Sequence, residues 1–249
     1  MLILLTNDDG IHSKGLLALR ETLAKTDNVC VVAPERERTC VSHTITLHKP
    51  LRIKKITGNV YASNGSPADC IYLGIKAILK KKPDMIISGI NKGPNMGRDV
   101  HYSGTVAAAK EGAFLGIPSL AVSICARERF LFNDAASVTH TIIERIKNKP
   151  FTDGFFLNIN IPNVPGSNLN GFMMTKLGKR IYNDEVFERV DPRGGKYYWI
   201  GSGTENYERK HGTDFYAVEK GYVSITPLGL DMTYAGSIGN YKTYFRRSL

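Results

Sequence analysis

The feature that most constrains the fold is an alternation of short apolar runs with amphipathic stretches over the first two thirds of the chain. This alternation is typical of a parallel β-sheet covered by helices, because two parallel strands need a long crossover between them. The apolar runs predict strands at residues 2–5, 29–33, 85–88, 119–124 and 155–161. We therefore expect an α/β protein with a mostly parallel sheet and flanking helices.

Four amphipathic stretches predict the helices. Apolar residues recur at three- and four-residue spacing in the first, at Leu16, Leu19 and Leu23. The second begins with Ser66-Pro67-Ala68-Asp69, which has a capping serine and an acid three residues later, and it should run to about residue 79. The third and fourth are expected over about residues 105–116 and 134–147.

The composition and periodicity of the sequence change after Pro162. Glycine and proline become frequent, helical periodicity fades, and residues 196–200 and 221–225 have the composition of strands. We place a boundary near residue 165. The prediction is a first region over 1–165 and a smaller β-rich C-terminal region over 166–249.

Net charge and composition indicate which classes of partner the protein could bind and where in the cell we expect it. The net charge of +10 favours anionic partners such as nucleic acid, anionic lipid or phosphorylated metabolites, although a basic surface can also serve solubility alone. No apolar run approaches the roughly 18 residues of a membrane span. Five apolar residues lead directly into Asp8 and Asp9, unlike a secretory signal, so we expect a cytoplasmic protein without a membrane partner. The four cysteines form no C-x-x-C unit that would indicate zinc or redox chemistry.

Two adjacent carboxylates, Asp8 and Asp9, follow the first predicted strand. Like charges this close are costly unless a cation neutralises them, so a metal ion is their natural partner. The nearby donors are carboxylate, hydroxyl and amide oxygens, which favour Mg²⁺, Mn²⁺ or Ca²⁺ over Zn²⁺. The lone Gly10 does not make the G-x-G-x-x-G turn of a dinucleotide site. The alternative is that Asp9 caps the next helix while Asp8 is solvated.

A second polar cluster, residues 88–112, follows the third predicted strand, and its loop is rich in glycine, with Gly89, Gly93, Gly97 and Gly104. Within it, Ser103-Gly104-Thr105 meets a helix start, where free backbone N–H groups and two hydroxyls suit a phosphate. An ordinary helix cap by Ser103 or Thr105 is compatible with this interpretation. A third cluster, residues 34–39, leaves the second strand toward the same edge of the sheet. His12, His43 and His101 lie near these clusters, but a lone loop histidine is more often a hydrogen-bonding or exposed residue than a catalyst.

The sequence resembles the SurE survival-protein family of metal-dependent nucleoside monophosphate phosphatases. The matching stretches are LLTNDDGI (4–11), VVAPERER (31–38), SPADCIYLG (66–74), SGINKGPNMG with DVHYSGTVAAAKEG (88–112), LNINIP (157–162), DPRGGKYYWIG (191–201) and GTDFYAVEKGYVSITPL (212–228). They cover most of the chain. TNDDG together with SGINKGPN and YSGT is a highly specific combination.

The resemblance implies a Rossmann-like catalytic region over 1–165, a C-terminal region over 166–249 that takes part in homodimer or homotetramer assembly, and one divalent cation per subunit, Mg²⁺ or Mn²⁺. It also implies the residues of the site. The metal ligands would be Asp8, Asp9, Thr39 and Asn91, and the phosphate would be held by Asn95, Ser103, Gly104 and Thr105. Family members usually carry serine and glycine where this chain has Thr39-Cys40.

The implied reaction is that of a 5′-nucleotidase, which hydrolyses a nucleoside monophosphate to nucleoside and phosphate. Asp8 or Asp9 is the expected general base, and 3′-nucleotides and short polyphosphates stay open as further substrates. No stable nucleic-acid partner is expected.

Two alternatives stay open at this point. An aspartyl-phosphate phosphatase of the haloacid dehalogenase type would also place an acid after the first strand, but it uses D-x-D rather than adjacent acids. A non-catalytic nucleic-acid-binding protein would fit the basic charge, yet the sequence contains no recognisable module of that kind.

Overall fold

The structure is a computed structural model, and it describes residues 1–149, 151, 154–181, 184–202 and 206–242. Among these residues, nine strands form one central sheet in the order β3-β4-β2-β1-β5-β6-β7-β13-β8. The strands are β1 (Leu2–Thr6), β2 (Asn28–Pro34), β3 (Ile53–Thr57), β4 (Val60–Ser63), β5 (Met85–Lys92), β6 (Ser119–Cys125), β7 (Phe155–Pro162), β8 (Phe172–Met174) and β13 (Val223–Gly229). The six strands from β4 to β7 in this order pair in parallel, which confirms the predicted fold class.

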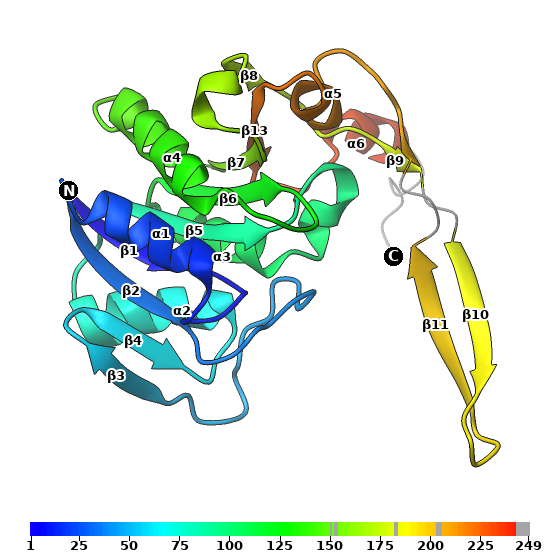
Figure 1. Cartoon of the computed structure of the whole chain (residues 1–249), viewed down its shortest axis with the longest axis horizontal. Helices are drawn as coiled ribbons and strands as arrows, with labels where there is room; N and C mark the ends of the chain where they lie inside the picture. Colours follow the sequence, from blue (N-terminus) through cyan, green and yellow to red (C-terminus); the bar gives the residue numbers. More distant parts are fainter. Residues whose placement is uncertain (150, 152–153, 182–183, 203–205, 243–249) are drawn as a thin grey trace.

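Helices cover both faces of this sheet (Figure 1). On one face, α1 (Lys14–Leu23) and α4 (Phe132–Ile146) pack on the strand residues that include Ile3 and Leu5. On the other face, α2 (Pro67–Leu73) and α3 (Gly104–Phe114) pack on the alternate residues, among them Leu4. The strand side chains alternate between the two apolar layers because successive residues of a strand point to opposite faces.

The predicted helices are confirmed, with shifts at their ends. Leu16, Leu19 and Leu23 of α1 are all buried, and α2 has the expected capping box between Ser66 and Asp69. The second helix does continue to residue 79, but its last part is the π-helix η1 (Gly74–Leu79). Two short 3₁₀ helices, η2 (Gly97–His101) and η3 (Gly166–Asn168), lie in the connections. Local sequence signals predict that a helix exists better than they predict its last turn.

The C-terminal third adds strands to the sheet and a projecting hairpin (Figure 1). β13 pairs antiparallel with β7 and parallel with β8, so strands on both sides of residue 165 share one sheet. The short pair β9 (Arg180–Ile181) and β12 (Asn206–Tyr207) leads to the hairpin of β10 (Asp184–Val190) and β11 (Lys196–Ser202). The remaining helices are α5 (Asp214–Glu219) and α6 (Ala235–Lys242). The division into two regions at residue 165 stays a prediction.

None of the helices in the described part of the chain has the length and apolar character needed to cross a membrane.

Candidate active site

The polar clusters that follow β1, β2 and β5 meet at one edge of the sheet. β1 lies between β2 and β5 and runs parallel to both, so the three strands end side by side. The backbone N–H of Arg38, after β2, donates to the Asp8 carbonyl at 2.7 Å. The N–H of Lys92, at the end of β5, donates to the Asp9 carboxylate at 3.3 Å. The clusters therefore surround the two acids, as the sheet topology predicted.

Asp8 is buried against the start of α3. Its carboxylate accepts hydrogen bonds from the backbone N–H of Thr105, at 3.1 Å, and from the Thr105 hydroxyl. Gly104 permits this approach, since a Cβ there would lie 2.9 Å from the Asp8 Cβ. Burial raises the pKa of Asp8 to about 6, against the opposing effect of the hydrogen bond from Thr105. Asp8 is thus a desolvated acid aimed at a helix N-terminus.

Asp9 lies beside Lys92, and its side chain is only 7% exposed. The Lys92 ammonium is 3.4 Å from its carboxylate. Burial raises the pKa of Asp9, although the neighbouring Lys92 acts in the opposite direction. The alternative in which Asp9 caps α1 is wrong, because Ser13 caps that helix by accepting from Leu16.

Thr39 and Asn91 are sequence neighbours of the residues that contact the acids, since Thr39 follows Arg38 and Asn91 precedes Lys92. The Thr39 hydroxyl donates to the Glu37 carboxylate at 2.5 Å, which leaves its lone pairs available to a cation. Cys40 has a φ of 55°, so this position requires the left-handed conformation that glycine adopts easily. The Asn91 amide nitrogen donates to the Gly93 carbonyl at 2.8 Å, and its amide oxygen is the side available to a ligand.

The predicted phosphate residues divide into two groups. Ser103 caps α3, accepting from the Val106 N–H at 3.1 Å, and Gly104 and Thr105 form its first turn beside Asp8. Asn95 is buried elsewhere, and its amide donates to Ser123 on β6 at 2.8 Å. The backbone of Asn95 bonds to the side chains of Asn158 and Asn160 on β7. The contacts of Asn95 therefore lead to β6 and β7, while Gly104 and Thr105 lie against Asp8 and Ser103 directly precedes them.

Comparison with known families agrees with this geometry. The family model described as "Survival protein SurE" matches residues 3–184 of the chain. The chain belongs to the SurE family. It is 45% identical over 245 residues to the 5′-nucleotidase SurE of Geobacter sp. (strain M21), covering 98% of this chain and 99% of that relative. It is also 45% identical over 241 residues to the 5′-nucleotidase SurE of Aquifex aeolicus (strain VF5), with 96% and 94% of the two chains covered.

A solved SurE structure has the same fold over nearly the whole chain. The crystal structure of the SurE protein from Aquifex aeolicus matches with a TM-score of 0.90 and 43% sequence identity. The match covers 98% of this chain and 99% of that one. The similarity therefore includes the C-terminal third and is not limited to the parallel sheet.

Three contacts near the site of this SurE-family chain were not predicted from the sequence. The first is the Lys92–Asp9 ion pair. The second is Asp214, which is fully buried and accepts from the Gly97 N–H at 2.7 Å, so it fixes the glycine-rich loop from a helix far along the chain. The third is the ion pair of His43 with Glu111. Lys92, Glu111 and Asp214 lie inside the matching stretches, which is a signal that could have singled them out, whereas His43 lies outside those stretches.

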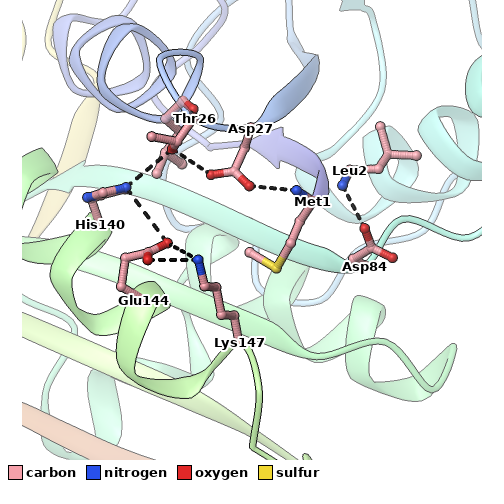
Figure 2. Close-up of polar contacts among 9 residues, drawn as sticks. Met1, Leu2, Thr26, Asp27, Asp84, His140, Glu144 and Lys147 are labelled. Carbon is pink, nitrogen blue, oxygen red and sulfur yellow. Dashed lines mark hydrogen bonds and ion pairs between the residues drawn. The ribbon is translucent and has the colours of Figure 1, made fainter.

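A cavity of about 570 Å³ lies at the opposite edge of the sheet, and Figure 2 shows the polar contacts of residues that line it, among them Met1, Asp27 and Lys147. Four of its charged groups form two ion pairs: the Met1 amine is 2.7 Å from Asp27, and Lys147 is 2.7 Å from Glu144. The Asp84 carboxylate accepts from the Leu2 N–H at 2.7 Å. Because parallel α/β sheets bind ligands at the carboxyl ends of their strands, the site beside Asp8 is the candidate active site.

Proposed function

We propose that this chain is a metal-dependent 5′-nucleotidase, a phosphoric monoester hydrolase that converts nucleoside monophosphates to nucleoside and phosphate. The observation that carries the proposal is the pair of adjacent buried acids, Asp8 and Asp9, at the start of α3 and the carboxyl edge of the sheet. Family membership supports it, since the relatives above are named 5′-nucleotidase SurE. Their nucleotide substrate is the class of ligand that we assign to this chain.

The donors around the two acids fit one divalent cation, Mg²⁺ or Mn²⁺. Asp8, Asp9, Thr39 and Asn91 offer carboxylate, hydroxyl and amide oxygens, which hard cations prefer. Burial raises the pKa of both Asp8 and Asp9, so a bound cation would offset the cost of holding the two carboxylates in their ionised form. Within the described ranges no three His, Cys, Asp or Glu side chains form a metal-binding group, but this donor set does not require three. When bound, the cation would supply positive charge to the phosphate and lower the pKa of a water molecule.

The chain's own residues bind and orient the phosphate. The first turn of α3 presents backbone N–H groups and the dipole of its helix, both of which favour an anion. Ser103 uses a lone pair to cap the helix, so its hydroxyl proton can be donated to a phosphate oxygen. Asp8 or Asp9 would accept the proton of the attacking water. Asn95 would act indirectly, because its side-chain hydrogen bond to Ser123 holds the glycine-rich loop after β5 in place.

A substrate panel tests this proposal. Phosphate release is measured with nucleoside 5′-monophosphates, 3′-monophosphates and short polyphosphate, with Mg²⁺ or Mn²⁺ and with a chelator. We expect metal-dependent turnover that falls by orders of magnitude in Asp8→Asn and persists in Glu21→Gln, an exposed acid on α1. If Asp8→Asn kept near-normal turnover with added metal, the assignment of the Asp8 carboxylate as a metal ligand would be wrong.

Other results of the same panel would favour the alternatives. A phosphoryl group trapped on Asp8 would indicate the aspartyl-phosphate mechanism of the haloacid dehalogenase type. A chain that releases no phosphate but binds nucleic acid would be a binding module.

We also propose a homodimer or homotetramer assembled through the β10–β11 hairpin. Its large apolar side chains are exposed on both faces of the ribbon, and Trp199 and Ile200 are 64% and 87% exposed. A contiguous apolar surface of this kind is typical of an interface between chains.

A cytoplasmic location stays a prediction, which cell fractionation would test.

A further inference from the structure

A cavity of about 260 Å³ extends from Ser103 along α3 to the C-terminal part of the chain. Its wall is largely apolar and includes Phe156 and Leu228, while His43, His101 and Lys110 supply polar groups. Because Ser103 belongs to the proposed phosphate site, whatever is esterified to the phosphate would lie in this cavity. His43 therefore faces the leaving group of the proposed reaction.

The His43 ring is fixed by contacts with α3. Its Nε2 is 2.6 Å from the Glu111 carboxylate, which is 7% exposed, and the ring stacks on Phe114 with centroids 5.9 Å apart. The preceding residue, Ser42, donates its backbone N–H to the Tyr102 carbonyl at 3.0 Å, directly before Ser103. One helix therefore positions both the phosphate-binding turn and the imidazole.

A buried carboxylate bonded to one ring nitrogen orients a histidine for proton transfer through the other nitrogen. The Nε2–H of His43 donates to Glu111, and Nδ1 has no hydrogen-bond partner among the residues that the structure describes. The ring in its protonated form would carry a proton on both nitrogens and would pair with the Glu111 charge.

We propose that His43 is the general acid that protonates the leaving oxygen of the nucleoside, with Glu111 as its positioning residue. The proposal rests on the 5′-nucleotidase function. As the water oxygen bonds to phosphorus, the P–O5′ bond breaks and its electron pair goes to O5′, which takes the proton of His43 Nδ1. The water proton goes to Asp8 or Asp9, and the neutral ring regains a proton from solvent. A ribose alkoxide is a poor leaving group, so this proton lowers the barrier.

The structural alternative is that the His43–Glu111 pair only anchors the loop over α3. The two roles differ in their dependence on the leaving group. An acid matters for an alkoxide and not for a thiolate, which leaves without a proton. Loss of an anchor would slow both reactions alike.

The experiment compares a nucleoside 5′-monophosphate with its analogue in which sulfur bridges the 5′-carbon and phosphorus. His43→Gln keeps an N–H that can bond Glu111 but removes the acid. We expect its kcat for the oxygen ester to fall about 100-fold or more, and its kcat for the sulfur ester to stay within about fivefold of the unmodified enzyme. Glu111→Gln should show the same selectivity to a smaller degree. His48→Gln, an exposed residue of the same loop, should leave both rates unchanged.

Equal losses on both substrates in His43→Gln would overturn the proposal, as would the selective loss appearing in His101→Gln instead. If circular dichroism shows that His43→Gln does not fold, His43→Asn is measured with both substrates, and its selectivity between the two esters tests the proposal. An unmodified chain that hydrolyses neither ester would overturn the nucleotidase function itself, which is a separate outcome.

Discussion

At the residue scale, Thr39 stands where the family resemblance implies a serine. Its hydroxyl is held by Glu37, and its γ-methyl restricts χ1 beside the proposed cation. We expect Thr39→Ser to keep or raise turnover. Thr39→Val, which has nearly the same size without the hydroxyl, should weaken metal binding and lower turnover. Titration of activity with Mn²⁺ measures both effects.

The comparison between the two Thr39 variants contains its own control, because Thr39→Val preserves the bulk and removes only the oxygen. A Thr39→Val enzyme that matches the unmodified enzyme across the titration would show that Thr39 is not a ligand. Asp8, Asp9 and Asn91 with water would then complete the site.

The buried Asp8 carboxyl should make stability depend on pH. Its folded pKa of about 6 lies above its ordinary value of 3.8, so the folded chain holds this proton more tightly than the unfolded chain does. The free-energy cost of burying the ionised Asp8 carboxylate is fully present above pH 6, and it is relieved as the pH falls from 6 toward 3.8. Asp8→Asn removes this titration. In metal-free buffer, the stability of the variant relative to its parent should therefore be about 2 kcal/mol more favourable near pH 7.5 than near pH 4.

Urea unfolding with a chelator at the two pH values measures this difference. The chelator is needed because a bound cation would compensate the charge. The same comparison with Glu21→Gln, on the exposed face of α1, should show no such change. A constant difference between Asp8→Asn and its parent at both pH values would contradict the assignment of a raised pKa to Asp8.

At the scale of elements, we expect substitutions in the β10–β11 hairpin to change assembly without changing how the rest of the chain folds. Phe187 pairs with Trp199 across the ribbon, and both are exposed. We expect Trp199→Lys to lower the oligomeric state, because it places a charge in the apolar surface proposed to bind another copy. It should change the thermal midpoint of the monomer little, since no core side chain is lost. Light scattering measures the mass, and calorimetry measures the midpoint.

The matched control is Met174→Lys, which introduces the same charge at an exposed apolar residue, 64% exposed, on strand β8. It should leave the mass unchanged. A Trp199→Lys chain with the mass of the unmodified protein would show that the hairpin is not the interface.

The same hairpin shows what local sequence patterns can and cannot predict. Residues 196–200 were predicted as a strand and form part of β11, but β10 was missed. The run Tyr197-Tyr198-Trp199-Ile200 is apolar at successive positions, a pattern typical of a strand buried on both faces. In the structure both faces are exposed. A sequence can show that a segment is apolar on both sides without showing whether its own chain covers it.

At the scale of the molecule, the fold was predictable because it repeats a local pattern. Alternating strands and helices predict a layered parallel sheet, and the ends of its strands predict where polar motifs gather. This reasoning correctly brought Asp8 and Asp9 together with the end of β5. It failed for contacts that depend on distant chain segments. Asp214 bonds to Gly97 across 117 positions, and β13 enters the sheet between β7 and β8.

Asn95 illustrates the same limit within the proposed site. The family resemblance implied a phosphate contact for Asn95, which stays a prediction, and in the structure its side chain bonds to Ser123 and its backbone to Asn160. Those partners come from the next two strands of the sheet, and no spacing within residues 88–112 indicates them. Motifs identify which residues gather at a site, and only the pairing of strands decides which of them face the ligand.

The projection of the hairpin from the body has a consequence for how the chain tolerates substitutions (Figure 1). β10 and β11 pair with each other, and none of their residues belongs to the three buried apolar clusters that stabilise the fold. A substitution there changes neither the core nor the residues around Asp8. The side chains of the hairpin can therefore be altered by substitution without disturbing the packing of the fold, so the effect of such a change falls on whatever surface the hairpin meets.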